Sequence, residues 1–173
     1  MIETTRLRLR QCQSDDARFI QELFSQPECI EFIGDKGLTE LALAEQYIKE
    51  NLQASYQEHG YGLYLMELKS SGERIGLCGL VKRDYLQLPD LGFALLSQYT
   101  GKGLMLEASK AVLYFCQQQL GLDELLAITK PHNLRSIQLL TKLNFKQVIL
   151  ASKREELSQV NTFHLDLVES LTR

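Results

Sequence analysis

Gln98-Tyr99-Thr100-Gly101-Lys102-Gly103 is the stretch that decides the fold of this chain, because it joins a predicted strand directly to a predicted helix. The strand runs from Asp90 to Leu96, and the helix extends to about Gln119. Closely spaced glycines let a backbone approach a ligand without obstruction by Cβ, and the first N–H groups of a helix lie unsatisfied at the positive end of its dipole. The junction therefore predicts a cradle for a phosphate or pyrophosphate. An ordinary turn that uses glycine for positive φ is the alternative, so the surrounding sequence has to decide.

Two well-known phosphate-binding loops do not match this stretch. A Walker-type loop needs a glycine where the chain has Leu96, and a Ser or Thr where it has Gly103. A dinucleotide-binding turn needs a third glycine at the position of Leu106, and its strand opens a βαβ unit instead of lying mid-chain. The first class of nucleotide site is excluded, and the second is disfavoured.

The composition is that of an average globular protein and favours a single domain over residues 1–173. Of the 173 residues, 45% are hydrophobic and 24% charged, with a formal net charge of −3. This acidic balance argues against direct nucleic-acid binding, which needs clustered Lys and Arg. No apolar run approaches the ~20 residues of a membrane span, so we expect no membrane partner.

The four cysteines do not indicate a metal site or a disulfide framework. Cys12, Cys29, Cys78 and Cys116 lie far apart and form no CxxC pair. Reduced thiols and a cytoplasmic location are therefore expected, with no metal.

Hydrophobic periodicity and turn residues predict the other elements, with period 2 for strands and 3.6 for helices. In chain order they are a strand around Leu7 and Leu9, helices from Ser14 to Pro27 and from Thr39 to about Gly60, strands from Tyr61 to Lys69, Arg74 to Arg83 and Asp90 to Leu96, a helix ending at Gly121, a strand from Leu125 to Thr129, a helix from Asn133 to Leu143, and strands near Phe145 to Ala151 and Thr162 to Val168. The three central strands should form an antiparallel meander. The strand at 125–129 should be parallel to the one before it, with a right-handed crossover, because a helix connects them.

Two motifs lie on the expected elements. A cofactor motif of the form Arg/Gln-x-x-Gly-x-Gly/Ala is met by Gln98, Gly101 and Gly103, and a second marker, Asn-x-x-Ser/Ala followed by Lys-x-Gly-Phe, is met by Asn133, Ser136, Lys142 and Phe145 with Asn144 in place of its glycine. With this order of elements, the chain resembles the GNAT superfamily of acyl-CoA-dependent N-acyltransferases over essentially its whole length. The segments 3–10 and 100–108 look most like the branch that includes Rim-type ribosomal-protein N-terminal acetyltransferases.

The resemblance implies an α+β (mixed α/β) fold. Its central sheet is mixed but mostly antiparallel, with about six to seven strands, a splay between the fourth and fifth strands, and about four flanking helices. The unpaired backbone groups of Phe93, Ala94 and Leu95 would then bind the pantetheine arm as if it were an added strand. Gly79 suits a bulge that starts such a splay, although a tight packing contact explains a strand glycine equally well.

The resemblance also implies acetyl-CoA as co-substrate, with its pyrophosphate at the glycine turn. The expected cofactor-binding residues are Phe93, Ala94, Leu95, Gln98, Tyr99, Thr100, Gly101, Lys102, Gly103, Leu104, Asn133 and Ser136. Lys102 either adds positive charge there or is a solvated side chain. Asn133 either contacts the cofactor arm or caps its helix.

Direct attack of an amine on a thioester calls for a base and for protonation of the thiolate. Asp90 is the first candidate for the base, although an Asp beside Pro89 also serves to end a loop. Glu67 is the reserve. The thiolate donor usual among the family's members is missing, because Leu140 stands where many of them carry a tyrosine. Either the hydroxyl group of Ser136 or solvent would then protonate the thiolate, and a plain hydrogen bond from Ser136 to pantetheine is the favoured alternative role of this residue.

The leading hypothesis for the function is acetylation of a protein N-terminal α-amine. A small amine such as a polyamine or aminoglycoside is the close alternative, and a non-catalytic acyl-CoA-binding module is an alternative of another class. The segments 29–38 and 82–89 should face the substrate but carry no recognisable code for it. A homodimer stays open.

Overall fold

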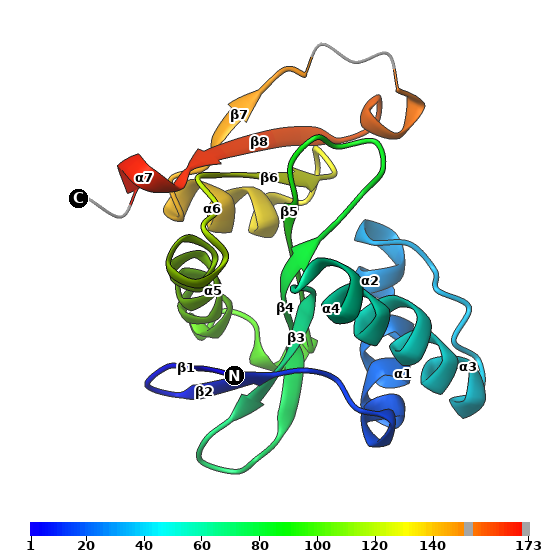
Figure 1. The fold of residues 1–173 in the computed structure, drawn as a ribbon. Helices are drawn as coiled ribbons and strands as arrows, with labels where there is room; N and C mark the ends of the chain where they lie inside the picture. Colours follow the sequence, from blue (N-terminus) through cyan, green and yellow to red (C-terminus); the bar gives the residue numbers. More distant parts are fainter. Residues whose placement is uncertain (151–153, 171–173) are drawn as a thin grey trace.

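The computed structural model describes residues 1–150 and 154–170, and its strands form one eight-stranded sheet (Figure 1). The strands are β1 (Ile2–Glu3), β2 (Leu7–Arg10), β3 (Leu63–Leu68), β4 (Arg74–Val81), β5 (Asp90–Leu95), β6 (Glu124–Thr129), β7 (Lys146–Val148) and β8 (Asn161–Asp166). Their order is β1-β2-β3-β4-β5-β6-β8-β7, and within the described ranges only the β5–β6 pair is parallel. The mixed, mostly antiparallel sheet is confirmed, as are the β3–β4–β5 meander and the parallel β5–β6 pair.

The helices lie on both sides of the central strands. They are α1 (Ala17–Ser25), α2 (Pro27–Phe32), α3 (Leu41–Tyr47), α4 (Ala54–His59), α5 (Leu104–Leu120), α6 (Leu134–Lys142) and α7 (Leu167–Ser170). In Figure 1, α1 to α4 lie on one side of β3–β5 and α5 on the other. No helix among the described residues is long and apolar enough to cross a membrane.

Some element boundaries differ from the prediction for local reasons. The helix predicted up to Pro27 does end there, at Ser25, because Gln26 is extended. Pro27 then begins the unpredicted helix α2, since proline at the first helical position lacks only an N–H that would be unpaired anyway. The helix predicted to start at Thr39 is capped at Glu40 and passes through a π-helical stretch, Ile48–Gln53, before it ends at Gly60 with φ 75°. The short strand β1 was missed.

The last two strands of the chain are also shorter than predicted. The strand expected near 145–151 is only β7, and its predicted end at Ala151 lies outside the described residues. The strand expected from Thr162 to Val168 begins at Asn161 and gives way to α7 at Leu167.

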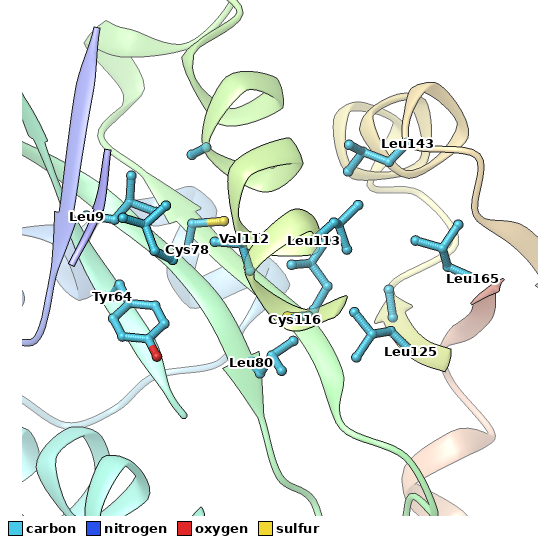
Figure 2. Packing of buried hydrophobic residues seen from close by; sticks show 14 of the residues in the cluster. Leu9, Tyr64, Cys78, Leu80, Val112, Leu113, Cys116, Leu125, Leu143 and Leu165 are labelled. Carbon is cyan, nitrogen blue, oxygen red and sulfur yellow. The ribbon is translucent and has the colours of Figure 1, made fainter. Parts of the chain in front are cut away.

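Successive side chains of the central strands point to opposite faces of the sheet and contribute to two hydrophobic clusters, one on each face. On one face, Leu65, Leu77 and Ala94 pack with buried residues of α1 and the following helices. On the other face, strand side chains pack around α5. Figure 2 shows this second cluster, which includes Leu9, Tyr64, Cys78, Leu80, Val112, Leu113, Cys116, Leu125, Leu143 and Leu165. The buried side chains on this face of β4 thus hold α5, and with it the glycine turn at its start, against the sheet.

The splay predicted between the fourth and fifth strands lies between β5 and β6, because the unpredicted strand β1 raises the number of each later strand by one. Strand β5 pairs with β4 along its whole length, but its register with β6 is limited to Asp90 opposite Leu126. In the described structure, the backbone of β5 beyond Asp90 therefore has no ladder partner on the β6 side.

Gly79 does not form a bulge at this splay. It lies opposite Gly92 in regular pairing, and the register shift of β4 is instead with β3, at Met66 and Glu67. A Cβ at Gly79 would collide with the carbonyl oxygen of Gly62. The glycine is therefore explained by close backbone approach, the second of the two readings of the sequence.

Candidate active site

The glycine turn has the geometry expected of an anion cradle. Gly101 and Gly103 have φ of 75° and 73°, in the left-handed region where L side chains are strained. Gly103 is the N-cap of α5, and no side chain caps the helix there. Residues 101–103 are exposed. The N–H groups of the first turn of α5 are thus open to an anionic ligand.

Lys102 lies over the ring of Tyr99, with its Nζ 5.1 Å from the ring centroid. Lys102 is exposed, and this cation–π contact keeps its ammonium group close to the turn. Its charge is therefore available to a polyanion bound at the turn.

A second part of the site is a cavity of about 620 Å³ at the splay. Among the sequence-predicted residues, Asp90, Phe93, Ala94, Asn133 and Ser136 line it. The cavity thus brings together the two predicted catalytic residues and part of the predicted pantetheine site.

The other predicted cofactor residues lie outside the cavity lining. Leu95 continues β5 opposite Gly76, and Leu104 is buried in the core around α5. The turn from 98 to 103 follows the end of β5 in the chain, whereas the cavity is lined by the preceding residues of that strand.

Asp90 is almost fully buried at the point where β5 and β6 part, at 1% exposure. Burial raises the pKa of Asp90 to about 6, although Arg83, whose Nε donates to Oδ1 at 2.9 Å, acts in the opposite direction. At neutral pH the carboxylate is ionised and can accept a proton. A pKa shifted by burial and one specific cation, in a cavity, is typical of a functional carboxyl group.

Ser136 and Asn133 line the cavity from the start of α6. Asn133 is the N-cap of α6, and its Oδ1 accepts a hydrogen bond from the Ser136 backbone N–H at 3.1 Å. The capping role is therefore observed, and both residues also line the cavity. Leu140, where many relatives carry a tyrosine, is fully buried in the core, so α6 places no phenol at that position.

Side chains from distant parts of the chain make contacts between α2 and the segment 130–135 near the cavity. Lys130 Nζ donates to the Glu31 carbonyl oxygen at 2.5 Å, and His132 Nε2 lies 3.2 Å from Glu31 Oε1. Arg135 Nη1 donates to Glu28 Oε1 at 2.9 Å. These contacts join α2 to the loop and first turn of α6. Phe32 of α2 and Lys130 of that loop also line the cavity.

The substrate-facing segments expected at 29–38 and 82–89 do reach the cavity, through residues that include Phe32, Lys36, Arg83 and Tyr85. Tyr47 on α3 also lines the cavity, which the sequence did not predict. Burial raises the pKa of its phenol above the usual value. Its apolar helical spacing made it read as a core residue. Arg83 was also missed as the partner of Asp90, because an irregular loop joins them and no periodicity predicts their contact.

Glu67 and Cys78 both lie outside the lining of the cavity. Glu67 accepts hydrogen bonds from Arg10 and is not among the lining residues, which removes the basis for its reserve role as base. Cys78 is fully buried beside Ser109, and burial raises the pKa of its thiol to about 12. It is therefore a small core residue.

Comparisons with known proteins agree with this geometry. The model of the acetyltransferase (GNAT) domain family matches residues 6–146. The uncharacterized N-acetyltransferase p20 of Bacillus licheniformis is 27% identical over 147 residues, covering 83% of this chain and 81% of that protein.

Two solved structures share the fold at low identity. RimL, a ribosomal-protein α-N-acetyltransferase solved in complex with coenzyme A, superposes with a TM-score of 0.79 at 16% identity, covering 94% of this chain and 95% of that one. A spermidine N-acetyltransferase SpeG chimera from Vibrio cholerae and hSSAT superposes with a TM-score of 0.74 at 17% identity, covering 98% and 100%. At these identities the likeness shows the fold alone. The family match over residues 6–146 establishes more: the chain belongs to the GNAT acetyltransferase family, and it is an acetyl-CoA-dependent acetyltransferase.

Proposed function

We propose that this enzyme acetylates the α-amine of a protein N-terminus, with Asp90 as the base that receives the proton of the attacking amine. The observation that carries the proposal is the ionisable carboxyl group of Asp90, buried in the cavity wall at the splay with a pKa of about 6. Acetyl-CoA supplies the activated acetyl thioester, and the chain's own residues bind, orient and exchange protons.

The pKa of Asp90 suits an α-amine better than an aliphatic amine. An α-ammonium group has a pKa near 7.7–8.0, about two units above that of Asp90, whereas a lysine-like ammonium at about 10.4 lies more than four units above it. Each unit corresponds to about 1.4 kcal/mol, so proton transfer to Asp90 is uphill by roughly 3 kcal/mol from the former and roughly 6 from the latter. Roughly a tenth of an α-amine is moreover already neutral at pH 7.

The residues proposed to hold coenzyme A extend from the cavity to the glycine turn. The backbone of Phe93 to Leu95 faces the open side of β5 and would hydrogen-bond the pantetheine arm. The N–H groups between Tyr99 and Leu104 would receive the pyrophosphate, with Lys102 beside it. Ser136, at 7% exposure in the cavity wall, would hydrogen-bond the arm from the other side.

The charges around the cavity do not favour a polycation. Among the described lining residues, the carboxylates of Glu50, Glu58, Asp90 and Glu156 are matched by the cations of Lys36, Lys82, Arg83 and Lys130. A site that selects a polyamine is expected to carry a surplus of carboxylates. Because SpeG is a spermidine acetyltransferase of the same fold, a small amine is the alternative that the experiment has to include.

Release of free thiol from acetyl-CoA, measured against N-terminal peptides, polyamines and aminoglycosides, tests the proposal. Turnover confined to the peptides, and at least a hundredfold slower in Asp90→Asn, is expected. Asp84→Asn, an exposed carboxylate on the preceding loop, is the matched control and should leave the rate unchanged. Turnover confined to polyamines would overturn the choice of acceptor, and wild-type rates in Asp90→Asn would overturn the role of Asp90.

A further inference from the structure

The β1–β2 hairpin is hydrogen-bonded to the first turn of α5, directly after the glycine turn (Figure 1 shows both elements). The acceptor of these hydrogen bonds is the carboxylate of Glu107. Its Oε1 accepts hydrogen bonds from Thr4 Oγ1 at 2.5 Å and from the backbone N–H of Arg6 at 2.9 Å, and its Oε2 accepts one from Arg6 Nε at 2.6 Å. Partial burial would raise the pKa of Glu107, but the hydrogen bonds from Thr4 and Arg6 hold it below its usual value. Glu107 is therefore ionised at neutral pH and fixes the Arg6 guanidinium.

The other side of the same guanidinium reaches the glycine turn. Arg6 Nη1 donates to the carbonyl oxygen of Lys102 at 3.0 Å, and a Cβ built on Gly103 would lie 3.7 Å from Arg6 Nη2. In a planar trans peptide, the C=O and N–H groups point to opposite sides. Because the Lys102 carbonyl points to Arg6, the N–H of Gly103 in the same peptide points away from the hairpin. That peptide is exposed, so this N–H is accessible from outside.

We propose that Arg6 is a positioning residue, which orients the Lys102–Gly103 peptide so that its N–H receives the pyrophosphate of coenzyme A. The inference rests on the proposed function, because it takes the glycine turn as the pyrophosphate site. Arg6 acts through geometry more than through charge, since Glu107 neutralises its guanidinium. A lysine at this position keeps the charge but lacks the fork that binds Glu107 and the Lys102 carbonyl at once.

The test compares ligands with and without the pyrophosphate. Arg6→Met and Arg6→Lys are each measured for coenzyme A binding by calorimetry, and for kcat/KM with acetyl-CoA and with S-acetylpantetheine, which lacks the pyrophosphate. Arg8→Met removes the other exposed arginine of the hairpin, which pairs with Glu3, and is the matched control. Thermal unfolding of every variant shows whether it is folded at the assay temperature, and the milder Arg6→Lys keeps the test usable if Arg6→Met is not.

We expect Arg6→Met to weaken coenzyme A binding about tenfold and to raise KM for acetyl-CoA to match, with kcat little changed. Arg6→Lys should weaken coenzyme A binding several-fold. In both variants, kcat/KM for S-acetylpantetheine should stay within twofold of the wild-type value. Unchanged coenzyme A binding in the two Arg6 variants would overturn the inference, as would equal losses on both thioesters, which a merely structural role predicts. If the wild-type protein itself bound no coenzyme A, the proposed function would fail first, and the two failures are thereby distinguished.

Discussion

Arg83 donates a hydrogen bond from Nε to Oδ1 of Asp90 at 2.9 Å, and this ion pair lies in the wall of the cavity at the splay. Asp90 is thus subject to two opposed influences: burial, which raises the pKa of its carboxyl group, and the guanidinium of Arg83, which lowers it. The balance leaves a carboxylate that is ionised at neutral pH yet not strongly stabilised in its charged form. Changing either residue should move the pH dependence of the reaction in a defined direction.

Replacing Arg83 by Gln should raise the pKa of Asp90 further, because it removes the cation that opposes the effect of burial. The acidic limb of kcat/KM against pH should move upward by about one to two units, the usual effect of one adjacent opposite charge. Arg8→Gln is the control, since Arg8 is exposed, pairs with Glu3 and is not among the residues lining the cavity. If the acidic limb of kcat/KM against pH did not move in Arg83→Gln, the group whose titration produces that limb would not be Asp90.

Ser136→Ala tests whether the hydroxyl group of Ser136 protonates the thiolate or only binds the pantetheine arm. We expect KM for acetyl-CoA to rise about two- to fivefold with kcat nearly unchanged, the loss of one ordinary hydrogen bond. Steady-state kinetics with the acceptor at saturation measure both values. A fall in kcat of a hundredfold or more, with KM unchanged, would instead assign proton donation to Ser136.

Asp16 is a fully buried carboxylate that ties β2 and β4 to the start of α1. It accepts hydrogen bonds from Arg10 at 2.7 and 2.8 Å and from the Gln13 backbone N–H at 2.8 Å, and it pairs with Arg74 Nε at 2.8 Å. Asp16→Asn should lower the free energy of unfolding by about 3–5 kcal/mol, because it leaves the arginines without their shared buried anion. Asp15→Asn, next to it but exposed, should change it by less than about 0.5 kcal/mol.

Urea unfolding at several pH values adds a check on Asp16. Burial would raise the pKa of Asp16, but the hydrogen bonds from Arg10 and Gln13 bring it below the usual 3.8. The stabilisation is therefore present above that pH and is lost as the pH falls through the lower, folded-state value. The difference between wild type and Asp16→Asn should shrink on acidification, and a constant difference would contradict this account.

Gly79→Ala should destabilise the sheet strongly. Its Cβ would meet backbone atoms of Gly62 and Leu63, which cannot move without shifting β3, so a cost of about 3 kcal/mol or more is expected. Gly92→Ala in the neighbouring strand meets only the side-chain ends of Val81 and Leu63, at 2.9 and 3.1 Å, and should cost clearly less. Equal unfolding free energies for the two variants would show that β3 and β4 are not packed as described.

The sequence predicted those features that depend on local backbone chemistry. Gly101, Gly103 and Gly121 have positive φ at the two ends of α5, and Asn144, which stands in place of the motif's glycine, has φ 67°. These residue types are the ones that adopt the left-handed region at low cost, so their positions could be read directly. Strand pairing followed from the same kind of reasoning, since alternation and connection length restrict the topologies available.

The features that the sequence did not predict are contacts between side chains far apart in the chain. Arg6 with Glu107 and Lys130 with Glu31 join residues about a hundred positions apart, and exposed charged residues carry no periodicity that would pair them. The carboxylate of Asp90 was found because it lies at a strand end, but the shift in its pKa depends on burial and on Arg83, which only the folded structure brings together.

The most direct test of the central claim is the pH dependence of kcat/KM, with an N-terminal peptide as acceptor, in wild type and Asp90→Asn. The wild type should show a limb rising through about pH 6, as Asp90 loses its proton, followed by the titration of the α-amine near 7.7–8.0. Asp90→Asn should be slower by at least a hundredfold and should lack the limb near pH 6. A variant that keeps both this limb and the wild-type rate would contradict the assignment of Asp90 as the base.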